Sequence, residues 1–315
     1  MFGTSASTLA AVAQPPVALT DAQKAFQGFE GSLGVAKKYF STRSRLGKSY
    51  WLYDSLEYRR AVKNLYDAVN PFIRDVLDNT DNTKDELSRN IIESLAAMGC
   101  DQEEIANQCM HIFISGTIAS AAALGFTLGS LERNPHAFAR LRAEVLAAFG
   151  TEDEPKQEMN GDTIKGVQYL QWVVQETLRL YPAAAQDSRI AIRDTVLPVG
   201  GGPDGTEPLA VKKGARIQLC TYYMHRRPDF WGEDADSFRP ERWEGRKKGG
   251  EYLPFGGGPQ MCVGRKSFPF VPPSLFRNNS LTILLCRSIR NEPSRIRYRT
   301  IRSVVQGLGE AAYAG

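Results

Sequence analysis

The residue with the most distinctive chemical setting is Cys262, which lies in the glycine-rich stretch 255–264. Glycines in such a stretch let the backbone adopt positive φ angles and approach a large, flat group closely. Backbone N–H groups around a single thiol favour its thiolate form, which is a metal ligand. A thiolate bound to haem iron pushes electron density toward O–O bond cleavage. Inert packing of an isolated buried cysteine is the alternative interpretation.

A second set of residues could place paired charges inside the protein. Glu176 and Arg179 are three residues apart, which puts them on one face of a helix. Arg242 follows Pro240 in the sequence Phe-Arg-Pro-Glu-Arg-Trp. If Arg242 reaches Glu176, a buried Glu–Arg–Arg triad results, because buried charges persist only when they satisfy one another. The Glu-x-x-Arg spacing alone is common on solvated helices, so it indicates a site only together with the other motifs.

The elements that must position these residues are helices up to residue 185 and short strands after Pro182. Apolar residues at helical spacing predict helices over the ranges 54–77, 83–98, 136–149 and 164–181. Short strands are predicted over 190–192, 195–198 and 215–221, with a glycine-rich turn at 200–205. The sequence therefore predicts a mainly α fold with a small β region in its second half.

Composition excludes several classes of protein. The 315-residue chain is 42% hydrophobic and 23% charged, as globular proteins are. Its five cysteines include no Cys-x-x-Cys pair and its three histidines no His-x-x-x-His spacing, so neither a disulfide framework nor a zinc hydrolase is expected. The net charge of +4 arises in a basic tail, since residues 266–315 carry +6. No nucleic-acid partner is expected, because the tail contains no recognisable binding module.

One segment is long and apolar enough that a membrane span must be considered. Residues 112–131 carry no charge, and a segment of about this length spans a bilayer. Small and polar residues make it poor in bulky hydrophobic side chains, and both of its flanks continue as helices. A buried helix of a soluble protein is therefore favoured over a membrane span. Residues 1–20 lack the positively charged start of a secretory signal.

Three separated motifs, taken in order, resemble the cytochrome P450 family of haem-thiolate monooxygenases. They are Glu-x-x-Arg at 176–179, Pro-Glu-Arg-Trp at 240–243, and Phe-x-x-Gly-x-x-x-Cys-x-Gly at 255–264. The runs 177–182, 189–205 and 252–264 are most similar to the fungal branch that acts on long-chain alkanes and fatty acids. The resemblance implies an incomplete cytochrome P450 fold, in which the uncharged segment 112–131 is the long helix across the distal face of the haem.

The resemblance also assigns roles to individual residues. It makes Cys262 the axial ligand of haem b, and it makes Glu176, Arg179 and Arg242 a structural triad that holds the proximal side of the haem. Five further residues would contact or surround the haem: Phe255, Gly258, Gln260, Gly264 and Arg189. Gln260 stands where the family usually has a charged partner for a haem propionate, so it can donate a hydrogen bond but supplies no charge.

The implied activity is hydroxylation of an apolar small molecule with O₂ and electrons from NADPH. The substrate would be a long-chain fatty acid, an alkane-like molecule or a secondary metabolite, and the electron donor would be NADPH–cytochrome P450 reductase. The resemblance thus implies that the protein is an oxidoreductase and a monooxygenase that binds a metal, the iron of haem.

The distal helix departs from the family pattern. Where the family has an acid and a threonine that relay protons to iron-bound oxygen, this sequence has Ile118 and Ala119. The hydroxyls of Thr117 and Ser120 are the remaining catalytic candidates. Hydrogen bonding of both hydroxyls to the helix backbone is the alternative interpretation.

The ends of the chain also depart from the family. Residues 1–265 are predicted to be a partial cytochrome P450 domain without the family's N-terminal third, and residues 266–315 a basic tail unlike the family. The family typically lies in the endoplasmic reticulum membrane, but its anchor segment is expected to be absent here, so localisation stays open. We expect little monooxygenase activity from the chain as written. The alternatives are a degenerate or mis-spliced non-catalytic relative and, more remotely, a membrane-spanning or nucleic-acid-binding protein.

Overall fold

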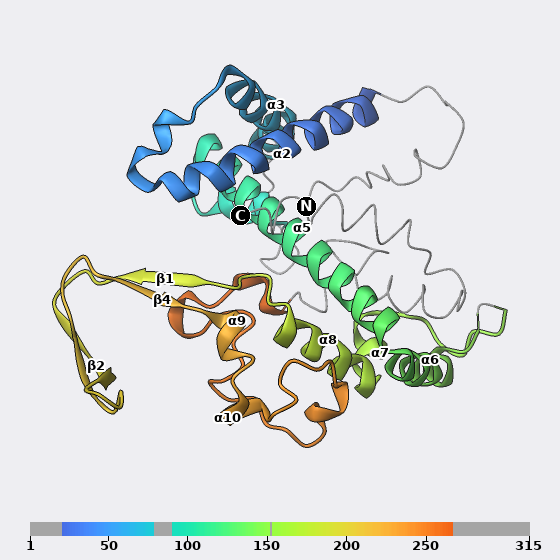
Figure 1. Cartoon of the computed structure of the whole chain (residues 1–315). Helices are drawn as coiled ribbons and strands as arrows, with labels where there is room; N and C mark the ends of the chain where they lie inside the picture. The colour runs from blue at the N-terminus through green and yellow to red at the C-terminus, as the bar shows by residue number, and fades with distance from the viewer. Residues whose placement is uncertain (1–20, 79–89, 152, 267–315) are drawn as a thin grey trace. The chain divides into compact units, whose positions relative to one another are not determined.

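The computed structural model describes residues 21–78, 90–151 and 153–266 (Figure 1). These residues form a mainly helical structure with a small β region, as the sequence predicts. The helices are α2 (Asp21–Leu46), η1 (Gly47–Leu52), α3 (Leu56–Asp78), α4 (Ile91–Ala97), α5 (Gln102–Arg133), α6 (Pro135–Phe149), α7 (Gly161–Lys165), α8 (Gln168–Leu180), α9 (Thr221–Met224), α10 (Pro228–Trp231), η3 (Pro240–Trp243), η4 (Gly258–Gln260) and η5 (Val263–Lys266).

The chain divides into two compact units, and the boundary between them follows Thr117 within α5. The described part of the first unit is residues 21–78 and 90–117. That of the second is residues 118–151 and 153–266. The glutamate–arginine motifs and Cys262 all belong to the second unit. The predicted basic tail, apart from Lys266, lies outside the described residues, so it stays a prediction.

The first unit is built on α2, α3 and α4. Apolar side chains at helical spacing on α3, including Leu65, Val69 and Ile73, join Phe29 of α2 in one buried cluster. The predicted helix at 83–98 is described only from residue 90, and there it is the short helix α4. Asn90 begins α4 as a capping box, because its side chain accepts the backbone N–H groups of the first turn.

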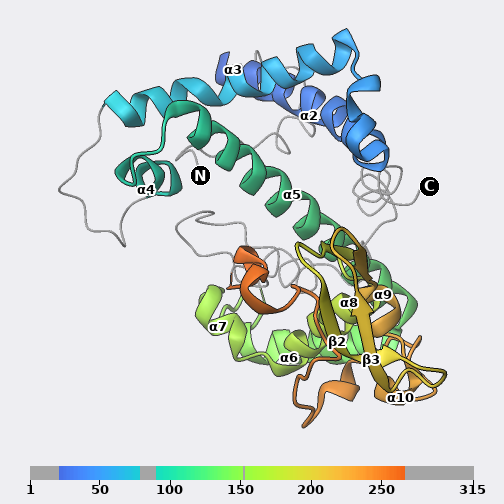
Figure 2. The same ribbon diagram turned by 90° about the vertical axis from the view of Figure 1, so that its left-hand side faces the viewer.

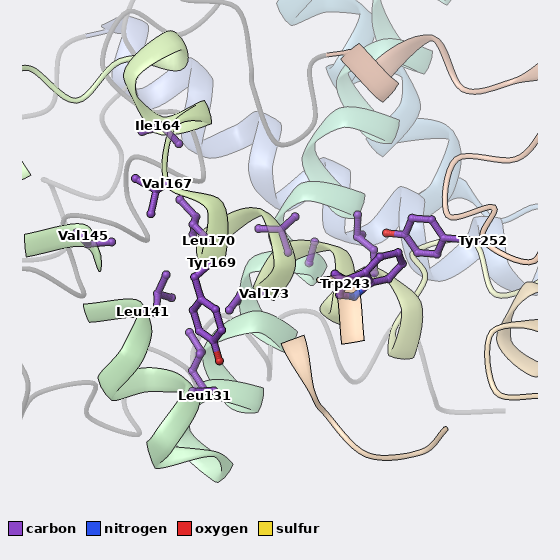
Figure 3. Close-up of a cluster of buried hydrophobic side chains, with 14 of the residues drawn as sticks. Leu131, Leu141, Val145, Ile164, Val167, Tyr169, Leu170, Val173, Trp243 and Tyr252 are labelled. Atoms are coloured by element: carbon purple, nitrogen blue, oxygen red, sulfur yellow. The ribbon is translucent and has the colours of Figure 1, made fainter. Parts of the chain in front are cut away.

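The second unit has its core between α6 and α8. Val145 of α6 and Tyr169 and Leu170 of α8 belong to one cluster of buried side chains (Figure 3). The helix predicted over 164–181 is two helices, α7 and α8, so that prediction is wrong in its continuity. The break falls at Val167, whose extended backbone (φ −84°, ψ 92°) interrupts the helical dihedral angles.

Four strands form two separate antiparallel pairs. Strand β1 (Asp187–Ile190) pairs with β4 (Arg216–Leu219), and β2 (Thr195–Gly201) pairs with β3 (Glu207–Val211). Figure 2 shows β2 and β3 side by side as a hairpin. The strand expected at 190–192 lies earlier, because Ile190 is its last residue and the chain turns there. Strand β3 was not predicted, since Pro208 is unusual within a strand.

Helix α5 contains the uncharged segment. Within the described residues it is the one helix long and apolar enough to cross a membrane, a criterion that core helices of soluble proteins also meet. In the second unit, Ala123, Thr127 and Leu131 are buried at helical spacing, so one face of α5 packs against the core. The Thr127 hydroxyl donates a hydrogen bond to the carbonyl of Ala123 inside the helix.

Candidate functional site

The structure brings Glu176, Arg179 and Arg242 into one buried cluster. Glu176 and Arg179 lie on α8, and both are fully buried. Arg179 donates two hydrogen bonds to the Glu176 carboxylate, from Nε to Oε2 at 2.9 Å and from Nη2 to Oε1 at 2.8 Å. Arg242 of η3 binds the same carboxylate, with its Nε 2.8 Å from Oε1. We call these three residues the triad.

Every guanidinium N–H of Arg179 has an acceptor. Besides the two bonds to Glu176, Nη1 donates to the carbonyls of His225 and Ala235 at 2.8 and 2.6 Å, and Nη2 donates to the carbonyl of Ser237 at 3.2 Å. Removing one partner of a buried ion pair is costly because a charge is left without compensation. The backbone after α9 is therefore tied to α8 through this one side chain.

The Glu176 carboxylate receives two further hydrogen bonds. The Trp243 indole N–H donates to Oε2 at 3.0 Å, and the Arg239 backbone N–H donates to Oε1 at 2.9 Å. Donors from two segments, α8 and residues 239–243, thus converge on one buried anion. Two arginines around a single glutamate leave one positive charge to be balanced.

Asp234 supplies that balance. Its carboxylate lies 3.2 Å from Nη2 of Arg242 and 3.2 Å from Nε of Arg239. Although partial burial acts to raise the pKa of Asp234, the hydrogen bond and charge of Arg242 and the charge of Arg239 together hold the pKa below its usual range. Asp234 is a site residue that the sequence motifs do not single out. It could have been found from the sequence, because two buried arginines that share one glutamate require a second carboxylate nearby.

Cys262 lies in a loop that begins beside the triad and turns outward. Tyr252 is buried at the start of the loop, and Trp243 of the triad region packs against it with ring centroids 4.6 Å apart (Figure 3). The Cys262 backbone N–H donates to the carbonyl of Phe255 at 2.9 Å, which closes the loop on itself. The thiol side chain is exposed.

Glycines set the shape of the Cys262 loop. Gly256 and Gly258 have φ angles of 72° and 73°, a region that residues with a side chain rarely adopt. A Cβ atom placed on Gly258 would meet no atom within 4 Å, so that side of the loop is open. A Cβ atom on Gly264 would lie 3.6 Å from the Cys262 Sγ, so a bare backbone flanks the sulfur there.

The four described cysteines have different environments. Cys109 is buried, and burial raises the pKa of its thiol, which disfavours the thiolate. Cys100 and Cys220 are half-buried, whereas Cys262 is exposed. An exposed sulfur on an open, glycine-rich loop fits a large planar group that needs one thiolate from the protein. Haem therefore fits the residues present, and the assignment of Cys262 as its ligand stays a prediction.

The other predicted haem contacts lie in varied settings. Phe255 is half-buried and packs against the core of the second unit, while Gln260 is exposed at the end of η4. Arg189 lies on β1, half-buried, and its Nη1 lies 2.6 Å from a carboxylate oxygen of Asp187. The hydrogen bond and charge of Arg189 lower the pKa of Asp187. The predicted haem contacts of Phe255, Gly258, Gln260, Gly264 and Arg189 stay predictions.

The distal candidates lie on α5, on both sides of the boundary between the units. Thr117 is the last residue of the first unit in this part of the chain. Ile118, Ala119 and Ser120 begin the second unit and are half-buried. Proton relay through Thr117 and Ser120 stays a prediction.

Comparisons with known proteins agree with this geometry. A cytochrome P450 family profile matches residues 38–266. Cytochrome P450 monooxygenase g430 of a Fusarium species is 39% identical over 235 residues, which cover 72% of this chain and 41% of that protein. Cytochrome P450 52A13 of Debaryomyces hansenii is 35% identical over 273 residues, which cover 84% of this chain and 52% of that protein. The chain belongs to the cytochrome P450 family.

A solved structure supports the same assignment. The crystal structure of a cytochrome P450 (CYP102L1) matches with a TM-score of 0.59 and 27% sequence identity, covering 75% of this chain and 51% of that one. Haem b with an axial cysteine thiolate is typical of the family, and the described fold is a part of the cytochrome P450 fold. The chain spans about half the length of the curated relatives it matches.

Proposed function

We propose that this chain forms the haem-binding part of a monooxygenase that hydroxylates an apolar small molecule. The observation that carries the proposal is the exposed Cys262 thiol on a loop anchored beside the buried triad. When bound, haem supplies the oxidative chemistry, in which a C–H substrate, O₂, NADPH and a proton give an alcohol, water and NADP⁺.

The protein's own residues hold and expose the thiol. The triad fixes α8 to the backbone around His225, Ala235 and Ser237, and Tyr252 extends that scaffold to the Cys262 loop. The loop carries the sulfur on its exposed side, with a bare glycine next to it. Cys262 would be the one protein ligand of the iron.

The substrate class rests on similarity to relatives. Two relatives, cytochrome P450 52A13 of Debaryomyces hansenii and cytochrome P450 52A1 of Candida tropicalis, are 35% and 34% identical to this chain over the matched residues. Together with the resemblance to the fungal alkane and fatty-acid hydroxylases, they support a long-chain fatty acid or alkane as substrate. NADPH–cytochrome P450 reductase is the proposed electron donor.

The decisive test is the difference spectrum of the reduced, carbon-monoxide-bound protein after reconstitution with haem. We expect a red-shifted Soret band that is lost in Cys262→Ala and retained in Cys220→Ala, a control at a half-buried cysteine of the same unit. A band at the position typical of neutral ligands, or failure to retain haem, would contradict the proposal. That result would favour a degenerate, non-catalytic relative.

A further inference from the structure

His225 is a fully buried histidine whose two ring nitrogens bind two different parts of the second unit. Its Nδ1 lies 3.1 Å from the carbonyl oxygen of Arg179, and its Nε2 lies 2.9 Å from the backbone nitrogen of Leu253. The Leu253 N–H can only donate, so Nε2 must carry the lone pair and Nδ1 the proton. Both bonds therefore require the neutral imidazole in one tautomer.

Each end of this bridge belongs to a functional part of the site. Arg179 is the central arginine of the triad, and its Nη1 donates back to the carbonyl of His225 at 2.8 Å. Leu253 begins the turn into the Cys262 loop, since its carbonyl accepts the N–H of Gly256 at 3.1 Å. The imidazole thus joins the triad to the backbone that leads to the sulfur.

The rings around His225 hold it in this orientation. Tyr252 stacks on the imidazole with centroids 5.3 Å apart, and its hydroxyl donates to the carbonyl of Gln175 on α8 at 3.1 Å. Trp231 meets the imidazole edge at 6.4 Å. Two adjacent residues are therefore held on α8 by different side chains. Tyr252 is held by its own hydroxyl, and Leu253 by His225, which also bonds the carbonyl of Arg179.

We propose that His225 is a positioning residue that sets the starting point of the Cys262 loop on the triad, and so the orientation of the thiolate toward haem. The inference deepens the proposed function and rests on it. His225 acts on the Cys262 loop through Leu253 and the backbone turn that follows.

Two amide substitutions separate the two bonds of the imidazole. The amide of Gln reaches about as far as Nε2, so His225→Gln can still accept the Leu253 N–H. The amide of Asn reaches only about as far as Nδ1, so His225→Asn can bond Arg179 but not Leu253. His136→Phe, at an exposed histidine on α6, is the matched control.

The measurement is amide hydrogen exchange of the full chain without haem, followed by the carbon monoxide difference spectrum after reconstitution. In His225→Asn we expect the amides of Leu253, Gly256 and Cys262 to exchange about ten-fold faster, with α6 unchanged. His225→Gln should stay within about three-fold of the wild type at these amides. In the spectrum, His225→Asn should shift the Soret band toward the neutral-ligand position, and His225→Gln should not.

Equal protection of the Cys262 loop in both variants would overturn the inference, and so would equal loss in both. Loss of protection throughout α6 in His225→Asn would mean that this variant is destabilised as a whole. The test then rests on His225→Gln, in which the amides of the Cys262 loop must stay protected. Failure of the proposed function is recognised separately, because the wild type would show no red-shifted band while the exchange results still stand.

Discussion

The triad and the Cys262 loop belong to the same unit and are joined through Tyr252 and Leu253, yet they are held in opposite ways. In the triad, Glu176 and Arg179 are fully buried and Arg242 is nearly so. The guanidinium N–H groups of the two arginines donate to carboxylates or backbone carbonyls. In the loop, the sulfur is exposed, and the turns are closed by backbone hydrogen bonds such as that from Cys262 to Phe255.

The difference shows how a reactive group is presented without being built into the core. Burial of charge is tolerated only where partners are complete, so the triad has one workable arrangement. A loop of glycines can place a sulfur at the surface, but it fixes little by itself. The loop takes its position from the scaffold at Tyr252 and Leu253, which bind Gln175 and His225.

The largest effect should come from removing the anion at the centre of the triad. Glu176→Ala leaves two buried arginines and the Trp243 N–H without their acceptor, and we expect it to lower the free energy of unfolding by about 3–5 kcal/mol. Urea unfolding of the full chain measures this. Glu132→Ala, at an exposed glutamate on α5, should change it by less than about 0.5 kcal/mol. Equal effects of the two substitutions would contradict the role of the triad.

Acidification should weaken the link that His225 makes between the triad and the Cys262 loop. Burial lowers the pKa of His225 to about 4, against 6.5 for an unperturbed histidine. Above pH 6.5 the imidazole is neutral whether the chain is folded or unfolded. Between pH 6.5 and 4 the unfolded chain takes up a proton that the folded chain resists, so the free energy of unfolding falls by about 3 kcal/mol from this group.

Because carboxylates also titrate in this range, the wild type is compared with His225→Gln. The fall in unfolding free energy between pH 7 and pH 4 should be about 3 kcal/mol smaller in the variant. Parallel curves for the two proteins would show that His225 is not buried as a neutral base.

A smaller effect should follow from Trp243→Phe. The variant keeps an aromatic ring in the core but removes the indole N–H that donates to Glu176 at 3.0 Å. Because that bond has a charged acceptor, we expect a loss of about 2 kcal/mol in unfolding free energy. Trp172→Phe, at a half-buried tryptophan on α8, is the control; a loss as large there would point to ring volume rather than to the hydrogen bond.

The smallest effect on stability should come from the residue most important for chemistry. Cys262→Ala removes an exposed sulfur and keeps the backbone bond to Phe255, so the unfolding free energy of the haem-free chain should change by less than about 0.5 kcal/mol. Urea unfolding without haem checks this. A loss comparable to that of Glu176→Ala would mean that the sulfur is part of the scaffold.

The two regions also differ in how far the sequence predicts them. The meeting of Arg242 with Glu176 follows from the requirement that buried charges be paired, a general rule that holds although the two residues are 66 positions apart. The bridge of His225 could not be predicted in this way, because a neutral imidazole needs no charged partner and its burial depends on the rings of Tyr252 and Trp231.

Secondary structure was predictable where one signal dominated. The helix at 136–149 and the existence of β2 follow from periodicity and turn residues. The single helix over 164–181 failed because apolar spacing continues through Val167 while the backbone does not. Strand β3 was missed because the pairing with β2 outweighs the presence of Pro208.

The measurement that tests the central comparison most directly is native-state amide hydrogen exchange of the haem-free full chain as a function of denaturant. We predict that the amides of α8 exchange only through global unfolding. The amides of Gly256, Met261 and Cys262 should exchange through local opening, about a hundred-fold faster in the absence of denaturant. Exchange of the loop and of α8 with one common free energy would contradict the account, because the loop would then be part of the rigid scaffold.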